Sequence, residues 1–315
     1  MMPALAKLHL SGQEGLLQAH AQLRLPPIAS QLAQRTGEQV LEKLGLFYRQ
    51  CGEAQRWAAV GLIEQQRGIE PKAVTQAARD QALALEWVTE HSWQLWRIAH
   101  EVLPACPERL ALLTRWRQAL TEQRDALCAL RHLPGAAISP AAAEPLKPWL
   151  SEWQQWVWQP LLETIERQGW DRLFVTPAEI QKRLESGPAS RCGLVAPGLP
   201  QRLEALWQEL WLATDALHHP GSLTAAEGIA GPVTPGSVPA ARGHLTHRCV
   251  WDGDRVADYA IQIPTERTLT AIAESLQGQP LPQQDNWQAG LGVWILSHAP
   301  CLEVAVVDST EVQHA

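Results

Sequence analysis

The spacing of the apolar residues changes once along this chain, and that change limits the folds that it can adopt. Apolar side chains recur at helical spacing through most of residues 28–218, most clearly between residues 71 and 102. After the irregular stretch 219–241 the pattern alternates, and Asp252-Gly253 is a turn signal between two alternating segments. The sequence therefore predicts an α+β fold that is mostly helical and has a small β hairpin late in the chain.

The predicted elements follow from these periodicities and from the Pro and Gly residues that interrupt them. We expect a single domain over residues 1–315, because a chain of this length can bury a substantial core without disulfide bonds. Helices are expected over residues 28–50, 52–67, 71–102, 107–131, 149–168, 177–186, 199–218, 265–276 and 287–298. Strands are expected over residues 7–10, 16–25, 243–251, 256–263 and 302–307, and the first two could extend the late hairpin.

Charge and hydropathy argue against two classes of partner. The 33 Asp and Glu residues outnumber the 26 Lys and Arg residues, and the resulting net charge of -7 does not suit a general nucleic-acid binder. The sequence has no run of about 18 apolar residues, so no transmembrane helix is expected. Lys7 interrupts the N-terminus early, which is unlike a signal peptide. We expect a cytoplasmic chain with no nucleic-acid and no membrane partner.

Tryptophan and cysteine are the two residue types whose placement needs an explanation. The 15 Trp residues are expected mostly in the core, where their large apolar area is buried. None of the six cysteines forms a C-x-x-C pair, so neither a disulfide framework nor a zinc site is expected. We expect four of them to be structural: Cys106, Cys128, Cys192 and Cys249.

Cys51 stands next to Gly52 at a predicted helix start. The free backbone N–H groups and the positive dipole end of a helix lower the pKa of a nearby thiol. A thiolate is the form that binds metal or attacks carbon. The alternative interpretation is a helix–helix joint with a buried thiol.

Two later segments also contain reactive residue types. Pro300 fixes the backbone before Cys301, although a core cysteine at a strand start fits equally well. Arg242 at a loop–strand junction could present its guanidinium to an anion, or it could be solvated. His244 and His247 fall on opposite faces of the predicted strand, so they are not both ligands of one metal.

Taken together and in this order, the three segments resemble the large subunit of nickel–iron hydrogenases. In that family an early R-x-C-G-x-C segment and a late D-P-C-x-x-C segment supply four thiolates to the nickel–iron centre. Between them lie an E-A-P-R-G-x-L-x-H segment, a hairpin and a P-T motif. The matching residues here are Arg49-Gln50-Cys51-Gly52, Arg242-Gly243-x-Leu245-x-His247, Pro264-Thr265 and Pro300-Cys301, and Gln13-Glu14-Gly15 is similar to the family's R-I-E-G segment.

The departures from this pattern concern the ligands. Ala54 and Val304 stand where the family has the two cysteines that bridge nickel and iron, and Ala299 replaces the family's Asp. The stretch after Cys301 lacks the His and the cleavable tail of the family's precursors. Such a chain looks like a relative that has lost the catalytic site, and it resembles the HupK/HoxV type of hydrogenase maturation protein. The segment around Leu46-Phe47 and Cys51 and the segment Glu90-His91-x-Trp93 also resemble that group.

This resemblance implies a degenerate large-subunit-like helical body and a non-catalytic scaffold or chaperone. Such a scaffold would transiently hold the Fe(CN)2CO moiety, iron with cyanide and carbon monoxide ligands, or deliver it to the large subunit. By position, Cys51 and Cys301 would bind the iron as metal ligands, Arg242 would donate hydrogen bonds to the cyanides, and His247 would lie behind them. The implied partners are the large-subunit precursor, small maturation chaperones and the iron-cyanide assembly complex.

Other interpretations stay open at this point. The chain could be a metal-free docking module for the large subunit or for maturation proteins, or a thiol-dependent enzyme that uses Cys51. For His247 and Glu14 a structural role is the simpler expectation. The Glu90-His91-Trp93 cluster lies in the middle of a predicted helix and is expected to serve packing or docking rather than chemistry.

Overall fold

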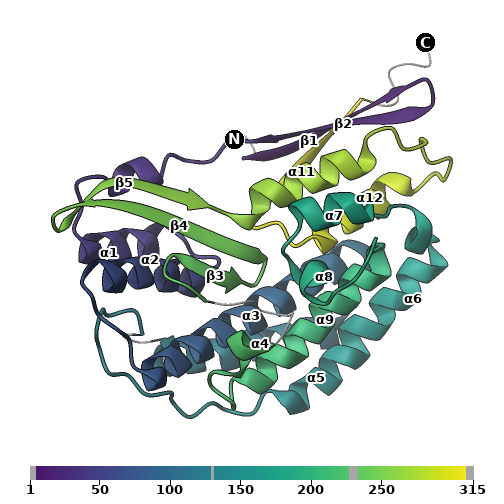
Figure 1. Cartoon of the computed structure of the whole chain (residues 1–315). Coiled ribbons are helices and arrows are strands. Elements are labelled where there is room, and N and C mark those ends of the chain that lie inside the picture. Colours follow the sequence, from purple (N-terminus) through teal and green to yellow (C-terminus); the bar gives the residue numbers. More distant parts are fainter. Residues whose placement is uncertain (1–4, 129–130, 227–232, 310–315) are drawn as a thin grey trace.

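The computed structural model describes residues 5–128, 131–226 and 233–309. In this part of the chain helices predominate, and two three-stranded sheets lie on one side of them (Figure 1). The prediction of a mostly helical α+β fold is confirmed. No helix in the described ranges has the length and the apolar character that crossing a membrane requires.

The longest helix, α3 (Ala73–Val102), contacts helices on several sides. It packs against α9 (Leu199–Ala216), α4 (Pro107–Cys128) and α2 (Gly52–Gln66). Its apolar residues recur at helical spacing, and Trp87 at its middle is fully buried. Because α3 crosses the body, residues along its length can reach sites that are far apart in the chain.

The shorter helices complete the body. They are α1 (Gly37–Phe47), α5 (Lys147–Trp153), α6 (Gln159–Arg167), α7 (Ala178–Leu184), α8 (Pro188–Arg191), α10 (Ser222–Ala225), α11 (Pro264–Leu276) and α12 (Trp287–Ser297). Two 3-10 turns cover Ala29–Leu32 and Trp170–Arg172, and a π turn, Gln154–Trp158, joins α5 to α6. Part of the irregular stretch expected over residues 219–241 lies outside the described residues, as do residues 129–130 of the helix expected over 107–131. Residue 131, where that helix was expected to end, is in a turn.

The helix expected over residues 28–50 is divided, because a capping signal lies inside it. The Thr36 side chain accepts the backbone N–H of Gln39, and the Gln39 side chain accepts the backbone N–H of Thr36. This reciprocal capping box starts α1 at Gly37. The residues before Thr36 form only a short 3-10 turn.

The strands form two separate sheets. In the first sheet β1 (Ala6–Gln13) pairs with β2 (Leu16–Leu23) in antiparallel fashion and with β6 (Val304–Asp308) in parallel. The second sheet has the order β3-β4-β5 and consists of β3 (Ser237–Ala240), β4 (Gly243–Asp252) and β5 (Arg255–Gln262). The predicted hairpin at Asp252-Gly253 is thus confirmed.

The idea that the N-terminal strands extend this hairpin is wrong. The free edge of β1 pairs with β6, which lies almost the whole chain away, and a local alternating pattern does not reveal such a partner. The residues that alternate along β1, from Ala6 to Leu10, are buried and join the main core. This core runs from Ala6 to Ala299 and holds most of the tryptophans, as expected. Its buried Trp residues are Trp57, Trp87, Trp96, Trp116, Trp153, Trp158, Trp170, Trp207, Trp287 and Trp294.

Candidate functional site

Cys51, Arg242 and Cys301 line one cavity of about 510 Å³, which we call the thiol cavity. The two cysteines are 250 positions apart in the sequence, and the fold brings them to the same space. The rest of the wall is mainly apolar. It comprises Leu5, Leu25, Pro26, Pro27, Ile28, Ala29, Phe47, Tyr48, Arg49, Gln50, Gln55, Ala240, Leu245, Ile261, Ile263, Pro264, Thr265 and Leu302.

Cys51 is the residue immediately before α2, and its backbone has a left-handed conformation with φ 53°. Its side chain caps no backbone N–H of the helix and is buried. Burial raises the pKa of the Cys51 thiol well above its usual range, and the Glu86 and Glu90 carboxylates raise it further. The expectation that the helix start lowers this pKa is therefore wrong.

Burial is the main cause of the raised pKa of Cys51, and the first turn of α2 does not compensate for it. Glu86 of α3 accepts the backbone N–H of Glu53 at 2.6 Å and that of Ala54 at 3.4 Å. These are the free N–H groups that would otherwise stabilise a thiolate at Cys51. The Glu86 side chain accepts them instead, so they are not available to the Cys51 sulfur.

Cys301 is held by the start of α11. Thr265 donates its hydroxyl to the Cys301 Sγ at 2.7 Å and accepts the Cys301 backbone N–H at 3.2 Å. Burial raises the pKa of Cys301, while the Thr265 hydrogen bond and the Arg242 charge oppose that rise. The P-T motif at residues 264–265 thus has a specific contact, which sequence reasoning did not assign to it.

Arg242 ties the Cys301 segment to α3. Its Nη1 donates to the backbone oxygens of Ala299 at 3.1 Å and Pro300 at 2.7 Å, and its Nη2 donates to the Glu90 carboxylate. Burial works against the charged guanidinium, but Glu90 together with the two thiol groups outweighs it and raises the Arg242 pKa. The buried Nε has no hydrogen-bond partner among the described residues.

Glu90 was expected to serve packing or docking, and the structure assigns it an electrostatic contact in the site. It forms a buried ion pair with Arg242. The sequence held no signal for this contact, because one more polar residue in a long helix looks the same whether or not it meets a distant arginine. His91, by contrast, places its Nε2 3.0 Å from a carboxylate oxygen of Glu209 of α9. Burial lowers the pKa of His91, which favours the neutral ring, and the contact is structural.

His247 lies behind the thiol cavity and does not line it. Its Nε2 lies 2.7 Å from the Gln55 Oε1, and its Nδ1 lies 2.8 Å from the Tyr259 hydroxyl. Gln55 does line the cavity, so His247 reaches the cavity only through that side chain. Burial lowers the pKa of His247 to about 3, which keeps the ring neutral. His244 is on the other face of β4, where it contacts Ser237.

Three further positions from the sequence comparison lie away from the thiol cavity. Ala54 is fully buried within α2, and Val304 lines a different pocket beside α12. Glu14 is exposed and forms the turn between β1 and β2 together with Gly15. None of the three is among the residues of the thiol cavity wall.

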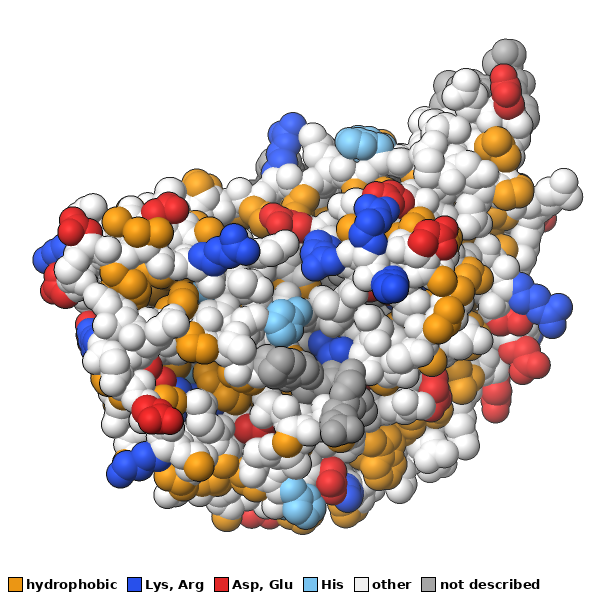
Figure 2. Space-filling model, in the orientation of Figure 1, with side chains coloured by type: hydrophobic (Ala, Val, Ile, Leu, Met, Phe, Trp, Pro, Cys, Tyr) orange, Lys and Arg blue, Asp and Glu red, His pale blue; other side chains and the backbone are white. Residues whose placement is uncertain are grey.

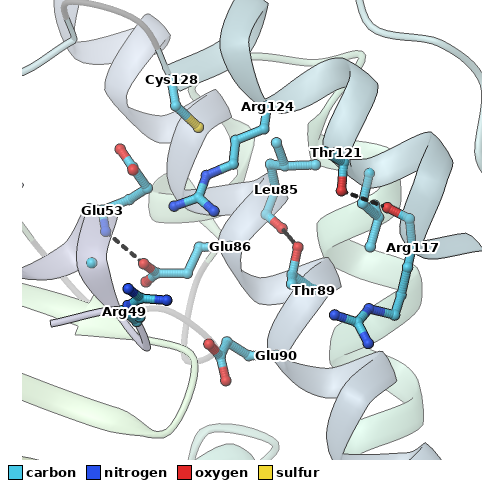
Figure 3. Close-up of a pocket in the computed structure, with 12 residues that line it drawn as sticks. Arg49, Glu53, Leu85, Glu86, Thr89, Glu90, Arg117, Thr121, Arg124 and Cys128 are labelled. Carbon is cyan, nitrogen blue, oxygen red and sulfur yellow. Dashed lines mark hydrogen bonds between the residues drawn. The ribbon is translucent and has the colours of Figure 1, made fainter.

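A second cavity of about 200 Å³ lies on the other side of the segment 49–53, and Arg49 lines both (Figure 3). We call it the carboxylate cavity, because Glu53, Glu86 and Glu90 line it. Burial raises the pKa of Glu86 well above its usual range, and the Glu53 and Glu90 charges add to that effect. The figure shows Arg49 and Arg124 on either side of the Glu86 side chain.

The donor set of the thiol cavity limits its chemistry. Within the described residues no group of three or more His, Cys, Asp or Glu side chains could hold a metal ion. Two thiols and a guanidinium are too few donors for a stable four-thiolate centre, but two soft ligands suit a metal that brings its own ligands. On the face of the molecule that Figure 2 shows, acidic and basic side chains are intermixed and form no large patch of one sign.

Comparisons with known proteins leave the family of this chain open. No model of a known protein family matches the sequence, and no curated protein matches it either. The functional argument therefore depends on the geometry of the thiol cavity and on the sequence motifs that line it.

Proposed function

We propose that this chain is a non-catalytic scaffold in nickel–iron hydrogenase maturation. It holds the Fe(CN)2CO cargo transiently between Cys51 and Cys301 and delivers it to the large-subunit precursor. The observation that carries the proposal is the shared cavity. Two motif cysteines and the motif arginine, far apart in the sequence, line the same space.

The chemistry of the cavity suits such a cargo. Low-spin iron with strong-field ligands accepts soft thiolates, and two of them leave coordination positions open for transfer. Both thiols have raised pKa values, so each must release a proton when it binds the metal. Cyanide is an anionic hydrogen-bond acceptor, and the unpartnered N–H of the buried Arg242 Nε is a donor suited to it.

The missing ligands favour release over retention. Ala54 and Val304 carry no donor atom and do not line the thiol cavity. Nothing at those positions could complete a four-thiolate nickel–iron centre. An iron held by two thiolates only is expected to exchange more readily than one held by four.

The observations favour this scaffold over a thiol-dependent enzyme. A nucleophilic cysteine needs a lowered pKa or an adjacent base, and burial raises the pKa of Cys51. No histidine is among the described residues of the cavity wall. A metal-free docking module would use the same fold without the thiols, and experiment separates it from the scaffold.

The decisive experiment is infrared spectroscopy, with iron analysis, on protein purified without oxygen from cells that express the maturation machinery. We expect carbonyl and cyanide bands and bound iron in the natural sequence. Cys51→Ala and Cys301→Ala should each reduce both signals at least tenfold. The matched control is Cys106→Ala, because Cys106 lies outside the thiol cavity wall.

The outcomes separate the alternatives. Absence of bands and iron, with the large-subunit precursor still bound, would replace the scaffold by the docking module. Bands that persist in both cysteine variants would remove the iron from the thiol cavity. The proposal also implies a cytoplasmic location and binding to small maturation chaperones and to the iron-cyanide assembly complex, which co-purification of the full chain would test.

A further inference from the structure

Glu86 is a buried glutamate that accepts its hydrogen bonds from the backbone, although Arg49 and Arg124 lie on either side of it in the carboxylate cavity (Figure 3). Among the described residues, each of the other buried glutamates forms an ion pair with an arginine: Glu53, Glu64, Glu90 and Glu209. Glu86 forms no ion pair in that set, and its hydrogen bonds come from the backbone of Glu53 and Ala54. A buried glutamate without an ion pair is unfavourable in its charged form, so the position of Glu86 needs a reason other than stability alone.

The start of α2 supplies that reason. A helix leaves its first N–H groups without partners, and the side chain of the N-cap residue usually accepts the N–H two or three residues later. Here the N-cap residue is Cys51, whose side chain accepts neither. Glu86 takes over both bonds from α3, as the dashed contact to Glu53 in Figure 3 shows.

The backbone of Cys51 also requires support. Its φ of 53° lies in the left-handed region, where a residue with a side chain is strained. Such a conformation persists only when its surroundings hold it. The hydrogen bonds from the Glu53 and Ala54 N–H groups to Glu86 fix the direction in which the chain leaves Cys51.

We propose that Glu86 is the positioning residue for Cys51: it caps α2 in place of the N-cap side chain and thereby leaves the thiol free to face the thiol cavity. The link to iron binding rests on the proposed function. The positioning itself concerns only Glu86, the first turn of α2 and the thiol, so it is testable without iron.

A second carboxylate on the same helix offers a matched control. Asp80 is buried, has no ion pair among the described residues, and accepts the backbone N–H groups of Gly221, Leu223 and Thr224. It therefore caps α10 from α3 as Glu86 caps α2. Asp80→Ala should loosen α10 without any effect on Cys51, which distinguishes positioning from a general loss of stability.

The experiment compares Glu86→Ala with Glu86→Gln in the full chain. Both substitutions remove the ionisable carboxyl group, but only glutamine keeps a side-chain oxygen for the Glu53 N–H. We would measure amide hydrogen exchange at residues 53 and 54 and, by peptide mass spectrometry, the rate at which a maleimide labels Cys51 relative to Cys301. In Glu86→Ala we expect exchange at least tenfold faster and relative labelling at least fivefold faster than in Glu86→Gln.

Equal labelling of Cys51 in the alanine and glutamine variants of Glu86 would overturn the proposal. An increase in Cys51 labelling in Asp80→Ala as large as that in Glu86→Ala would overturn it as well. If Glu86→Ala does not fold, Glu86→Asn replaces it, because its amide is one methylene too short to reach the helix start. These readouts involve no metal. Loss of infrared bands in the natural sequence would thus overturn the scaffold and leave the positioning role intact.

Discussion

The two cavities on either side of the segment 49–53 differ in almost every respect. The thiol cavity is the larger, at about 510 Å³, and its wall is mostly apolar with one buried guanidinium. The carboxylate cavity, at about 200 Å³, is lined by three glutamates and three arginines: Glu53, Glu86, Glu90, Arg49, Arg117 and Arg124. Cys51 thus lines a mostly apolar cavity, while Glu86 in the charged cavity accepts the first backbone N–H groups of α2.

This contrast shows how the fold keeps the Cys51 thiol protonated. Glu86 and Glu90 are one helical turn apart on α3, and both raise the pKa of Cys51. Glu86 holds the backbone of the segment, while Glu90 holds Arg242. The same pair therefore positions the site and disfavours a free thiolate, which is the form most easily oxidised.

The largest effect that we expect concerns acid and the histidines behind the two cavities. His247, behind the thiol cavity, has neutral partners and a pKa of about 3. An unfolded histidine titrates near pH 6.5, so the unfolded chain binds the extra proton between these values. The free energy of unfolding should therefore decrease as pH drops below 6.5, by up to about 4–5 kcal/mol at pH 3, so acid destabilises the folded chain.

Urea unfolding between pH 7 and pH 4 checks this expectation. His247→Gln should remove about 1.4 kcal/mol per pH unit from the slope. His132 beside the carboxylate cavity is the comparison. Burial lowers its pKa too, but the Glu53 carboxylate 2.8 Å away opposes that change. His132→Gln should reduce the slope less, and the reverse order would contradict the contrast between the two regions.

The next effect concerns the arginines. Arg242→Met leaves the buried Glu90 carboxylate without its cation, which should lower the free energy of unfolding by about 3–5 kcal/mol. Arg49 lines both cavities but is exposed and has no ion pair within the described ranges. Arg49→Met should therefore change the free energy of unfolding by less than about 0.5 kcal/mol. Denaturant unfolding measures both, and similar losses would mean that burial does not separate the two arginines.

The smallest effect concerns the two thiols. Thr265 hydrogen-bonds Cys301 and opposes the rise in its pKa, whereas no hydroxyl of the described residues does so for Cys51. Thr265→Val should lower stability by about 1 kcal/mol and shift the alkylation of Cys301 to higher pH. Site-resolved alkylation against pH tests this shift, with Cys51 as the internal reference. An unchanged Cys301 profile would show that the Thr265 contact does not tune the thiol.

The sequence determined much of the local structure. Apolar periodicity predicted the long helix α3, and the turn signal at Asp252-Gly253 predicted the β4–β5 hairpin. The capping box at Thr36 was present in the sequence as well, although the helix was expected to start earlier. These features depend on residues a few positions apart, so a local pattern is enough to reveal them.

The tertiary structure alone decided the site. Family motifs suggested Cys51, Arg242 and Cys301, but only the fold shows that they line one cavity. It also paired β1 with β6 and set Glu86 and Glu90 against α2 and Arg242. Such contacts join residues that are 30 to 300 positions apart, and the pKa of a thiol depends on which charges and how much water the fold leaves beside it. A local sequence pattern reveals neither these distant contacts nor the surroundings of the thiol.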